Sequence, residues 1–235
     1  MKALLLAAGF GKRLRPVTNE IPKCLVLIKD KPLLEYWLEE LQRINIDKIV
    51  VNTHYLSEQV DNYISHSEVA LKLLQDRRLE VRYEPVLLGT AATVRENYDV
   101  LKGDKLLLIH ADNWCRCSIS EFINYHNNER PEKTVMTMMT FKTESPSQCG
   151  IIEIDKQGVL VDFHEKVENP PSDLANGAVY MLEPEVVALI SQQSEVVDIS
   201  TQLIPKFIGK IATWENKGIH RDIGTVEMLK LAQND

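Results

Sequence analysis

Residues 8–23, AGFGKRLRPVTNEIPK, combine two glycines with four cationic side chains directly after the apolar run KALLLA. Glycine lets backbone NH groups approach an anion closely, and cationic side chains neutralise its charge. The whole chain has a formal net charge of -7, so this basic loop is a local exception. We therefore expect the loop to bind the phosphates of a small ligand. We expect no nucleic-acid partner, because such a partner requires an extended basic face.

The loop does not match the two commonest phosphate-binding motifs. A Walker A loop would need glycine where Leu6 stands and Ser or Thr where Arg13 stands. The dinucleotide pattern GxGxxG would need glycine at Leu14. The remaining description is a glycine turn with Arg13, followed by a Pro-Lys pair ending at Lys23 and by KPLLEY at the start of a helical pattern.

The elements that position this loop follow from the hydrophobic pattern. KALLLA and KIVVNT are typical of buried strands, and residues 32–44 between them carry leucines and Trp37 at helical spacing. Strand and helix patterns alternate up to about residue 130, which predicts a parallel sheet with right-handed crossovers. Consecutive strand patterns follow from 134 to 182, then two helical stretches, the strand pattern IATWEN and a helix beginning near Thr225. We predict an α/β fold with three layers around a mostly parallel mixed sheet.

Residues 7–36 resemble the N-terminal signature of the sugar-1-phosphate nucleotidyltransferases, also called nucleotide-sugar pyrophosphorylases. Two positions depart from that pattern: Lys12 replaces the usual Thr, and Leu27 stands where proline is common. Two later family blocks also depart from the usual residues: HAD at 110–112 replaces the commoner NGD, and Val167 stands in the proline position of the EKP block that begins at Glu165. Further family blocks follow in order: LLGTAA at 87–92, HAD at 110–112, FHEK at 163–166, NGAVY at 176–180 and DIGT at 222–225.

The resemblance implies a Rossmann-like nucleotidyltransferase fold and a specific reaction. A sugar-1-phosphate oxygen attacks the α-phosphorus of a nucleoside triphosphate in line, which releases pyrophosphate and forms a nucleotide sugar. We expect one domain over residues 1–235, with a nucleotide-binding half at about 1–130 and a sugar-binding half at about 131–235. The chain looks most similar to mannose- and heptose-1-phosphate guanylyltransferases, whose products supply polysaccharide biosynthesis.

The same resemblance assigns roles to individual residues. Asp112 and Asp222 would share one Mg²⁺, and Asp112 follows a strand pattern at the sheet edge where ligands of open α/β sheets bind. The alternative for Asp222 is a helix cap before IGTVEML. The proposed catalytic residues are Arg13, Lys23, Asp112 and Lys166; the proposed nucleotide-binding residues are Ala8, Gly9, Gly11, Glu84, Gly89 and Thr90; the proposed sugar-binding residues are Gly150, Glu165, Lys166 and Asn176.

The pair of Glu165 and Lys166 sets a condition on the local backbone. Side chains alternate along a strand, so both can face one cleft only where the strand ends or bulges. The alternative is an exposed ion pair on a strand.

The resemblance also implies a role for Glu84, since the family residue five places before the glycine of LLGTAA faces the Watson-Crick edge of the base. A carboxylate can accept from N1-H and N2-H2 of guanine, whereas uracil and thymine offer one NH between two carbonyl oxygens. GTP is therefore the favoured nucleotide. Two alternatives stay open: a UTP- or dTTP-using enzyme, in which Glu84 faces solvent or pairs with Arg82 or Arg95, and a regulatory subunit that binds nucleotide sugar without turnover.

The remaining sequence features exclude other classes. The six histidines show no HxH or HExxH spacing, so we expect no catalytic zinc. The four cysteines lack the spacing of a disulfide framework or zinc ribbon. No apolar stretch approaches the length of a membrane span, and no N-terminal segment reads as a targeting signal. We expect a cytoplasmic protein without a membrane partner, and homo-oligomerisation is left open.

Overall fold

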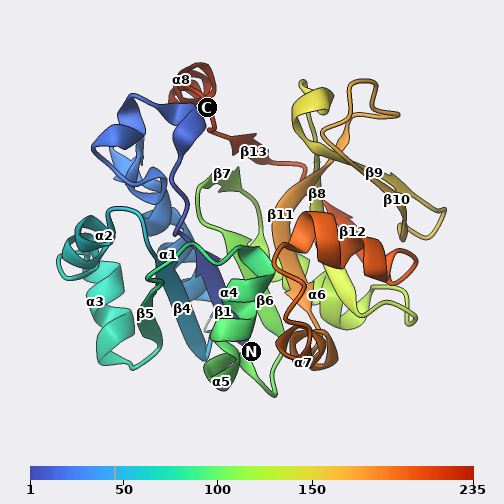
Figure 1. The fold of residues 1–235 in the computed structure, drawn as a ribbon, viewed down its shortest axis with the longest axis horizontal. Coiled ribbons are helices and arrows are strands. Elements are labelled where there is room, and N and C mark those ends of the chain that lie inside the picture. Colours follow the sequence, from blue (N-terminus) through green and yellow to red (C-terminus); the bar gives the residue numbers. More distant parts are fainter. Residues whose placement is uncertain (45) are drawn as a thin grey trace. The chain divides into compact units, whose positions relative to one another are not determined.

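The computed structural model describes residues 1–44 and 46–235, and the chain forms two compact units (Figure 1). The first unit contains Met1–Leu87, Ile109–Cys117 and Gly218–Asp235. The second unit contains Leu88–Leu108 and Ser118–Lys217. The units therefore interleave along the sequence, and the division of a single domain at about residue 130 stays a prediction.

The first unit is built on parallel strands. β1 (Lys2–Leu6) pairs with β4 (Lys48–Thr53), and β4 pairs with β5 (Leu79–Tyr83), both in parallel. β6 (Leu106–His110) starts in the second unit and ends in the first, where Ala111 N donates to Leu6 O at 3.1 Å just beyond the strand. Loops that leave the carboxyl ends of β1, β4, β5 and β6 thus begin at one edge of this sheet.

Among the helices of the first unit, α1 (Leu33–Arg43) was predicted and α3 (Glu68–Gln75) was not. α1 buries Leu34, Trp37, Leu38 and Leu41, as their spacing predicts. The sequence reading missed α3, whose first turn is capped by the side chain of Ser67 accepting from Ala70 N. The other elements of this unit are α2 (Ser57–Ile64), α8 (Val226–Asn234) and the short pair β2 (Leu27–Ile28) and β3 (Lys31–Pro32).

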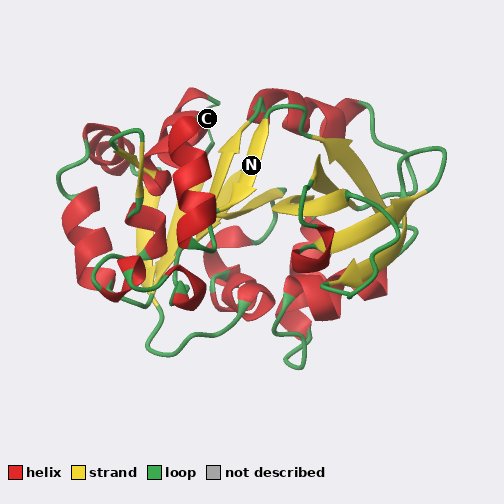
Figure 2. Ribbon diagram, turned by 90° about the horizontal axis from the view of Figure 1, so that it is seen from above, coloured by secondary structure: helices red, strands yellow, loops and turns green. Residues whose placement is uncertain are grey.

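The second unit contributes mainly antiparallel strands. β11 (Leu174–Leu182) is antiparallel to β8 (Met136–Lys142) and β9 (Gly150–Ile154), and β9 is antiparallel to β10 (Leu160–Glu165). β12 (Ile211–Glu215) runs parallel to β8. The predicted α/β class with a mixed sheet is confirmed (Figure 2).

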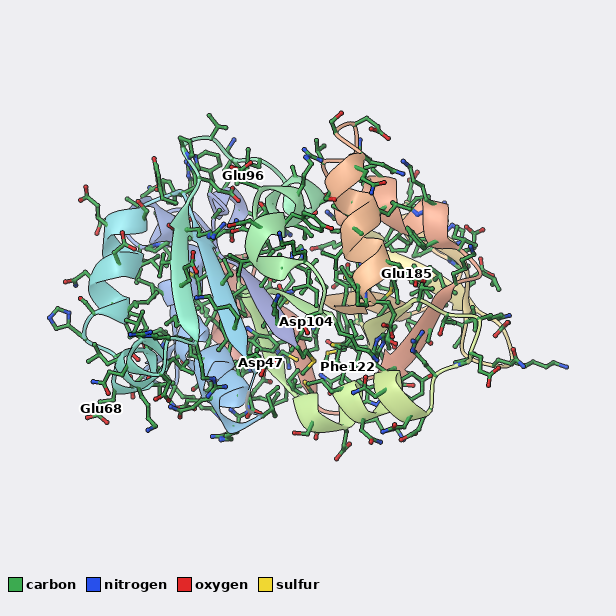
Figure 3. All side chains as sticks on the ribbon, turned by 90° about the horizontal axis from the view of Figure 1, so that it is seen from below. Asp47, Glu68, Glu96, Asp104, Phe122 and Glu185 are labelled. Carbon is green, nitrogen blue, oxygen red and sulfur yellow. The ribbon has the colours of Figure 1, made fainter. Side chains whose placement is uncertain are left out.

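Helices of the second unit differ from the sequence reading in two places. Residues 89–101 carry one continuous helical pattern among the alternating patterns before residue 130, but the structure divides it at Asn97 into α4 (Thr90–Glu96) and α5 (Tyr98–Leu101). α6 (Ile119–Asn128) was not predicted, and it buries Phe122 (Figure 3). The Phe122 and Trp214 ring centroids are 5.6 Å apart. α7 (Pro184–Gln192) and the helical turns of Ile199–Leu203 and Ile204–Phe207 match the predicted helical stretches.

A separate two-stranded ladder in the first unit was also missed. β7 (Asn113–Arg116) pairs antiparallel with β13 (Ile219–Asp222), and the register places Asp222 opposite Asn113. Among the described residues, no helix has both the length and the apolar content that a bilayer crossing requires.

Candidate active site

The glycine loop leaves β1 and folds into three short 3₁₀ turns, Lys12–Leu14, Val17–Asn19 and Lys23–Leu25. Gly11 has φ +61, and a Cβ at this position would lie 2.8 Å from Thr18 Cγ2. The Thr18 hydroxyl donates to Gly11 O at 2.8 Å and so closes the loop on itself. Gly9 is exposed, and a Cβ there would meet no atom within 4 Å. The backbone at Gly9 is therefore open to a ligand, while Ala8 is buried.

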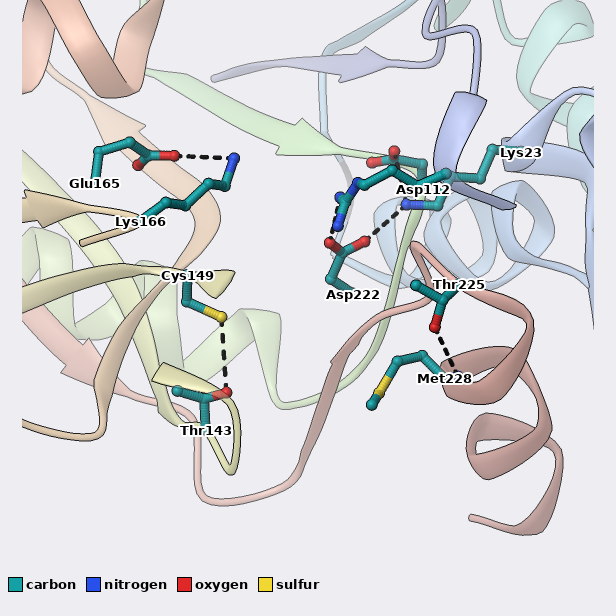
Figure 4. A network of polar contacts seen from close by, with 10 residues as sticks. Lys23, Asp112, Thr143, Cys149, Glu165, Lys166, Asp222, Thr225 and Met228 are labelled. Atoms are coloured by element: carbon teal, nitrogen blue, oxygen red, sulfur yellow. Dashed lines mark hydrogen bonds and ion pairs between the residues drawn. The ribbon is translucent and has the colours of Figure 1, made fainter. Parts of the chain in front are cut away.

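Lys23 lies between two carboxylates of the first unit (Figure 4). Its Nζ is 3.0 Å from Asp112 Oδ2 and 2.9 Å from Asp222 Oδ1. The Lys23 side chain is only 7% exposed, so these contacts are buried and differ from a solvated surface ion pair. Both aspartate side chains are about one third exposed, at 34% and 37%. One face of the carboxylate pair therefore contacts the ammonium, and the pair still reaches solvent.

Arg13 is the second cation of this group. Its Nη2 donates to Asp222 Oδ2 at 2.7 Å, and its side chain is 58% exposed. The guanidinium lies directly on Gly224, where a Cβ would be 2.8 Å from Arg13 Cζ. Gly224 was absent from the predicted site residues, although it is the glycine of the DIGT block. Its missing side chain lets Arg13 reach Asp222.

The β7–β13 ladder explains why Asp112 and Asp222 meet. Asp112 directly precedes Asn113, and Asn113 is the register partner of Asp222. The alternative role of Asp222 as a helix cap is wrong, since the Thr225 side chain accepts from Met228 N and caps α8 (Figure 4). The two carboxylates predicted as a metal pair are thus brought together by backbone pairing across 110 residues of sequence (222 − 112).

The electrostatics of the group favour charged forms. Burial alone would raise the pKa of Asp222, but the Lys23 ammonium and the Arg13 guanidinium outweigh it and hold that pKa at about 2. Burial alone would likewise lower the pKa of Lys23, but Asp112 and Asp222 raise it above its usual value. Asp222 and Lys23 are therefore ionised at neutral pH.

The donor chemistry of the pair fits a divalent cation. Asp112 and Asp222 each turn an oxygen toward one shared position, and a cation, the Lys23 ammonium, is already held by both. Carboxylate oxygens are the ligands that Mg²⁺ prefers.

Within the described residues a second group could also hold an ion: Glu153, Asp162 and His164 on β9 and β10 of the second unit, with ligand atoms within 4.8 Å of one another. The sequence reading did not assign that group to a metal.

Glu84 follows β5 and is 3% exposed, so it does not face solvent. Asn52 Nδ2 donates to Glu84 Oε1 at 2.9 Å, and Asn52 Oδ1 accepts from Ala7 N at 2.8 Å. His54 Nδ1 lies 2.8 Å from Glu84 O. Asn52 was not among the predicted site residues; its sequence signal is a polar amide directly after the apolar residues IVV of KIVVNT.

Glu165 and Lys166 meet the backbone condition stated from the sequence. β10 ends at Glu165, and Lys166 takes φ +50, which turns the chain out of the strand. Lys166 Nζ then lies 3.1 Å from Glu165 Oε1 (Figure 4). Opposite Glu165 in the register is Gly150, where a Cβ would be 2.7 Å from Glu165 Oε2. Gly150 thus makes space for the Glu165 carboxylate.

Asn176 lies on β11 next to a register shift between Asn176 and Tyr180. Its Nδ2 donates to the Tyr180 hydroxyl at 2.7 Å, and its Oδ1 accepts from Ala178 N at 2.9 Å. Ala178 has φ +53 within this irregular stretch. The amide of Asn176 is therefore held in one orientation by its own strand, and contact with a sugar stays a prediction.

Gly89 and Thr90 begin α4 in the second unit. A Cβ at Gly89 would lie 2.6 Å from Val197 O, so the residue is required for close backbone approach. The Thr90 hydroxyl donates to Asp198 Oδ2 at 3.1 Å and accepts from Ile199 N at 2.7 Å. Both residues have structural roles here, and their contact with nucleotide stays a prediction.

The predicted residues therefore gather in two sets. The first unit holds Ala8, Gly9, Gly11, Arg13, Lys23, Glu84, Asp112 and Asp222, and the second holds Gly89, Thr90, Gly150, Glu165, Lys166 and Asn176. The set in the first unit combines an open glycine backbone, two cations and two carboxylates at the carboxyl edge of a parallel sheet.

Residues 2–235 match the family model described as nucleotidyl transferase, and the chain belongs to this family. It is 28% identical over 229 residues to the mannose-1-phosphate guanylyltransferase catalytic subunit beta of Xenopus tropicalis, covering 95% of this chain and 61% of that protein. It is 29% identical over 217 residues to the UTP–glucose-1-phosphate uridylyltransferase of Synechocystis, covering 88% of this chain and 55% of that protein. The chain thus spans less than two thirds of the length of these relatives.

A solved structure supports the fold assignment. The structure of HddC from Yersinia pseudotuberculosis, complexed with GMP-PN, superposes with a TM-score of 0.80 at 20% identity. The match covers 99% of this chain and 98% of that chain. The predicted nucleotidyltransferase fold is confirmed.

Proposed function

We propose that this protein transfers a nucleoside monophosphate from a nucleoside triphosphate to a sugar-1-phosphate, with release of pyrophosphate and with GTP as the favoured nucleotide. The observation that carries the proposal is the group formed by Arg13, Lys23, Asp112 and Asp222 beside the glycine loop. Two phosphate-bearing substrates repel each other, so such a reaction depends on cations and positioning around the reacting phosphorus.

Each residue of the group has a part in this chemistry. Backbone NH groups at Gly9 and Gly11 bind the triphosphate, and Arg13 neutralises the departing pyrophosphate. Lys23 binds the α-phosphate and the attacking sugar phosphate, which holds them in line. Asp112 and Asp222 would hold Mg²⁺, which when bound neutralises charge on phosphate oxygens.

The second unit is proposed to bind the sugar phosphate. Lys166 contacts its phosphate, and the Glu165 carboxylate accepts hydrogen bonds from sugar hydroxyls. Gly150 provides the space for that carboxylate, and Asn176 completes the sugar contacts. We place the reaction in the cytoplasm as a supply of nucleotide sugar for polysaccharide synthesis.

The preference for GTP rests on Glu84. Its carboxylate is buried at the end of β5, where Asn52 fixes one oxygen, and a relative that covers 95% of the chain is a guanylyltransferase. A uridylyltransferase is among the relatives as well, so a UTP- or dTTP-using enzyme is the alternative. A regulatory subunit without turnover is less well supported, because Arg13, Lys23, Asp112, Lys166 and Asp222 are all present.

The test is a competition between equal concentrations of GTP, UTP, dTTP, CTP and ATP with a panel of sugar-1-phosphates and Mg²⁺. We expect GDP-sugar as the main product and erosion of that preference in Glu84→Gln, whose amide cannot accept on both atoms. Asp112→Asn is the inactive control. A dominant UDP- or dTDP-sugar would contradict the base assignment alone, whereas no product with any pair would favour the regulatory subunit.

A further inference from the structure

Lys23 contacts the same two carboxylates that are suited to a divalent ion. Its ammonium lies at 3.0 Å from Asp112 and 2.9 Å from Asp222, which are hydrogen-bonding distances for an ammonium between two acceptors. The Lys23 side chain is 7% exposed, and Lys23 belongs to the loop that the hydrogen bond between Thr18 and Gly11 closes. The contact is therefore an ordered part of the fold and differs from a mobile surface ion pair.

The charges of this group already balance. Asp112 and Asp222 contribute two negative charges, and Lys23 and Arg13 contribute two positive charges. A divalent cation bound to the two carboxylates would share their oxygens with the buried Lys23 ammonium, a few ångströms away. Like charges in a partly buried site repel each other strongly. The ion therefore needs either a second anion or the departure of Lys23.

We infer that Lys23 is a replaceable cation of the carboxylate pair. Its ammonium occupies the position between Asp112 and Asp222 until phosphate oxygens draw it away, so a divalent ion binds the pair tightly only together with the nucleotide. The inference rests on the proposed function in one respect, that the phosphate is that of a nucleotide. Lys23 thereby couples metal binding to substrate binding, in addition to its contact with phosphate.

The first experiment measures binding of Mn²⁺ alone, by electron paramagnetic resonance of the free ion. The Lys23→Met variant should bind one Mn²⁺ roughly tenfold or more tightly than the wild-type chain, because the competing charge is removed. Every protein in the series carries Glu153→Gln, which disables the exposed group of Glu153, Asp162 and His164.

Lys12→Met is the matched control. It removes the same charge from the same loop, but the Lys12 ammonium lies over the Phe10 ring, 5.3 Å from its centroid. Lys12→Met should bind Mn²⁺ like the wild-type chain, and Asp222→Asn added to Lys23→Met should abolish the gain. Equal affinity in Lys23→Met and Lys12→Met, or a gain that survives Asp222→Asn, would overturn the inference.

A second experiment tests the coupling to nucleotide. Binding of a triphosphate is measured with and without saturating Mn²⁺, and the ratio of the two affinities is compared between proteins. Coupling between two ligands is reciprocal, so Mn²⁺ should increase triphosphate affinity less in Lys23→Met than in the wild-type chain. The reduction should roughly equal the factor by which Lys23→Met binds Mn²⁺ alone more tightly. An unchanged ratio would contradict the inference.

Two further measurements distinguish the binding result from loss of the fold and from the proposed enzymatic function. Circular dichroism reports the fold; if Lys23→Met is unfolded without added metal, Mn²⁺ must restore its fold, and failure to fold at any Mn²⁺ concentration counts against the inference. Turnover is not needed for either binding measurement. A wild-type chain that binds nucleotide and shows the Mn²⁺ differences but forms no nucleotide sugar would refute the proposed function and leave the inference standing.

Discussion

The side-chain amide of Asn52 bonds at once to the Glu84 carboxylate and to the backbone of Ala7. Asn52 is 2% exposed, on β4 between β1 and β5. One side chain therefore fixes both the residue proposed to recognise the base and the first residues of the glycine loop. The residues proposed to bind the base and the phosphates are therefore linked through one buried side chain.

Replacing Asn52 should affect stability and base choice together. Asn52→Ala removes a buried hydrogen bond to a carboxylate and one to a backbone NH, so the free energy of unfolding should fall by about 1.5 to 3 kcal/mol in urea titrations. The ratio of kcat/KM for GTP over UTP should fall as well, because Glu84 loses its fixed orientation. Asn62→Ala, an exposed substitution on α2, should change stability by less than about 0.5 kcal/mol. An unchanged nucleotide ratio in a destabilised Asn52→Ala would limit Asn52 to a structural role.

The carboxylate pair should be essential for turnover. A carboxamide is a poor neutral substitute for an anionic ligand, so Asp112→Asn and Asp222→Asn should each lower kcat by roughly 100-fold or more at saturating Mg²⁺. Circular dichroism spectra should be unchanged. Asp61→Asn, on the exposed face of α2, is the control and should keep wild-type kinetics. A near-normal rate in Asp112→Asn would remove Asp112 from the site.

The two phosphate ends should separate kinetically. Lys166→Ala should raise KM for the sugar-1-phosphate more than KM for the nucleotide, whereas Arg13→Ala should mainly impair the nucleotide half of the reaction through kcat. Identical profiles for both variants would contradict the division of the site.

Gly224→Ala offers an independent check on Arg13. The added methyl group would lie 2.8 Å from Arg13 Cζ, and the flexible arginine can move aside, so stability should change by less than about 0.5 kcal/mol. The displaced guanidinium should nevertheless reproduce the kinetic profile of Arg13→Ala. Wild-type kinetics in Gly224→Ala would show that the contact with Asp222 is dispensable.

Acid should destabilise the second unit through His126. This residue is 0% exposed; burial, followed by the charge of Arg130, lowers its pKa from 6.5 to about 4 against the opposing effect of Glu183. The unfolded chain therefore takes up the proton first. The part of the free energy of unfolding that the lowered pKa of His126 provides is complete above pH 6.5. It is lost progressively as the pH falls toward 4, by up to about 3 kcal/mol. His126→Gln should show a flatter pH dependence of unfolding over that window; an identical slope would refute the assignment.

Local patterns predicted most of the regular elements but few of the contacts between them. The apolar face of α1 and the strands around it follow from side-chain periodicity, and the end of β10 at Glu165 follows from the requirement that two adjacent residues face one way. β7 and β13 span four residues each, too short for a periodic signal, and their pairing joins distant segments. The ion pairs of Lys23 could not be foreseen without that register.

The resemblance supplied the charged residues of the site but missed their supports. Asn52 and Gly224 hold or accommodate site residues through single contacts, and a buried amide or a small residue has no pattern that distinguishes such a role from ordinary packing. Thr90 is the opposite case: it was predicted to bind nucleotide, and its hydroxyl already makes hydrogen bonds to Asp198 and Ile199. The sequence therefore indicated the charged residues that the structure brings together more readily than the residues that orient them.

The β7–β13 ladder has a consequence for how the chain could change. The chain leaves the first unit after Cys117, one residue beyond β7, and returns to it at Gly218, one residue before β13. Residues 118–217 thus connect the two strands of the ladder along the sequence. Because backbone pairing of β7 with β13 sets the position of Asp222 next to Asn113, residues 118–217 can gain or lose residues while this register is kept. The second unit, where we propose that the sugar phosphate binds, can therefore vary while the spacing of Asp112 and Asp222 stays constant.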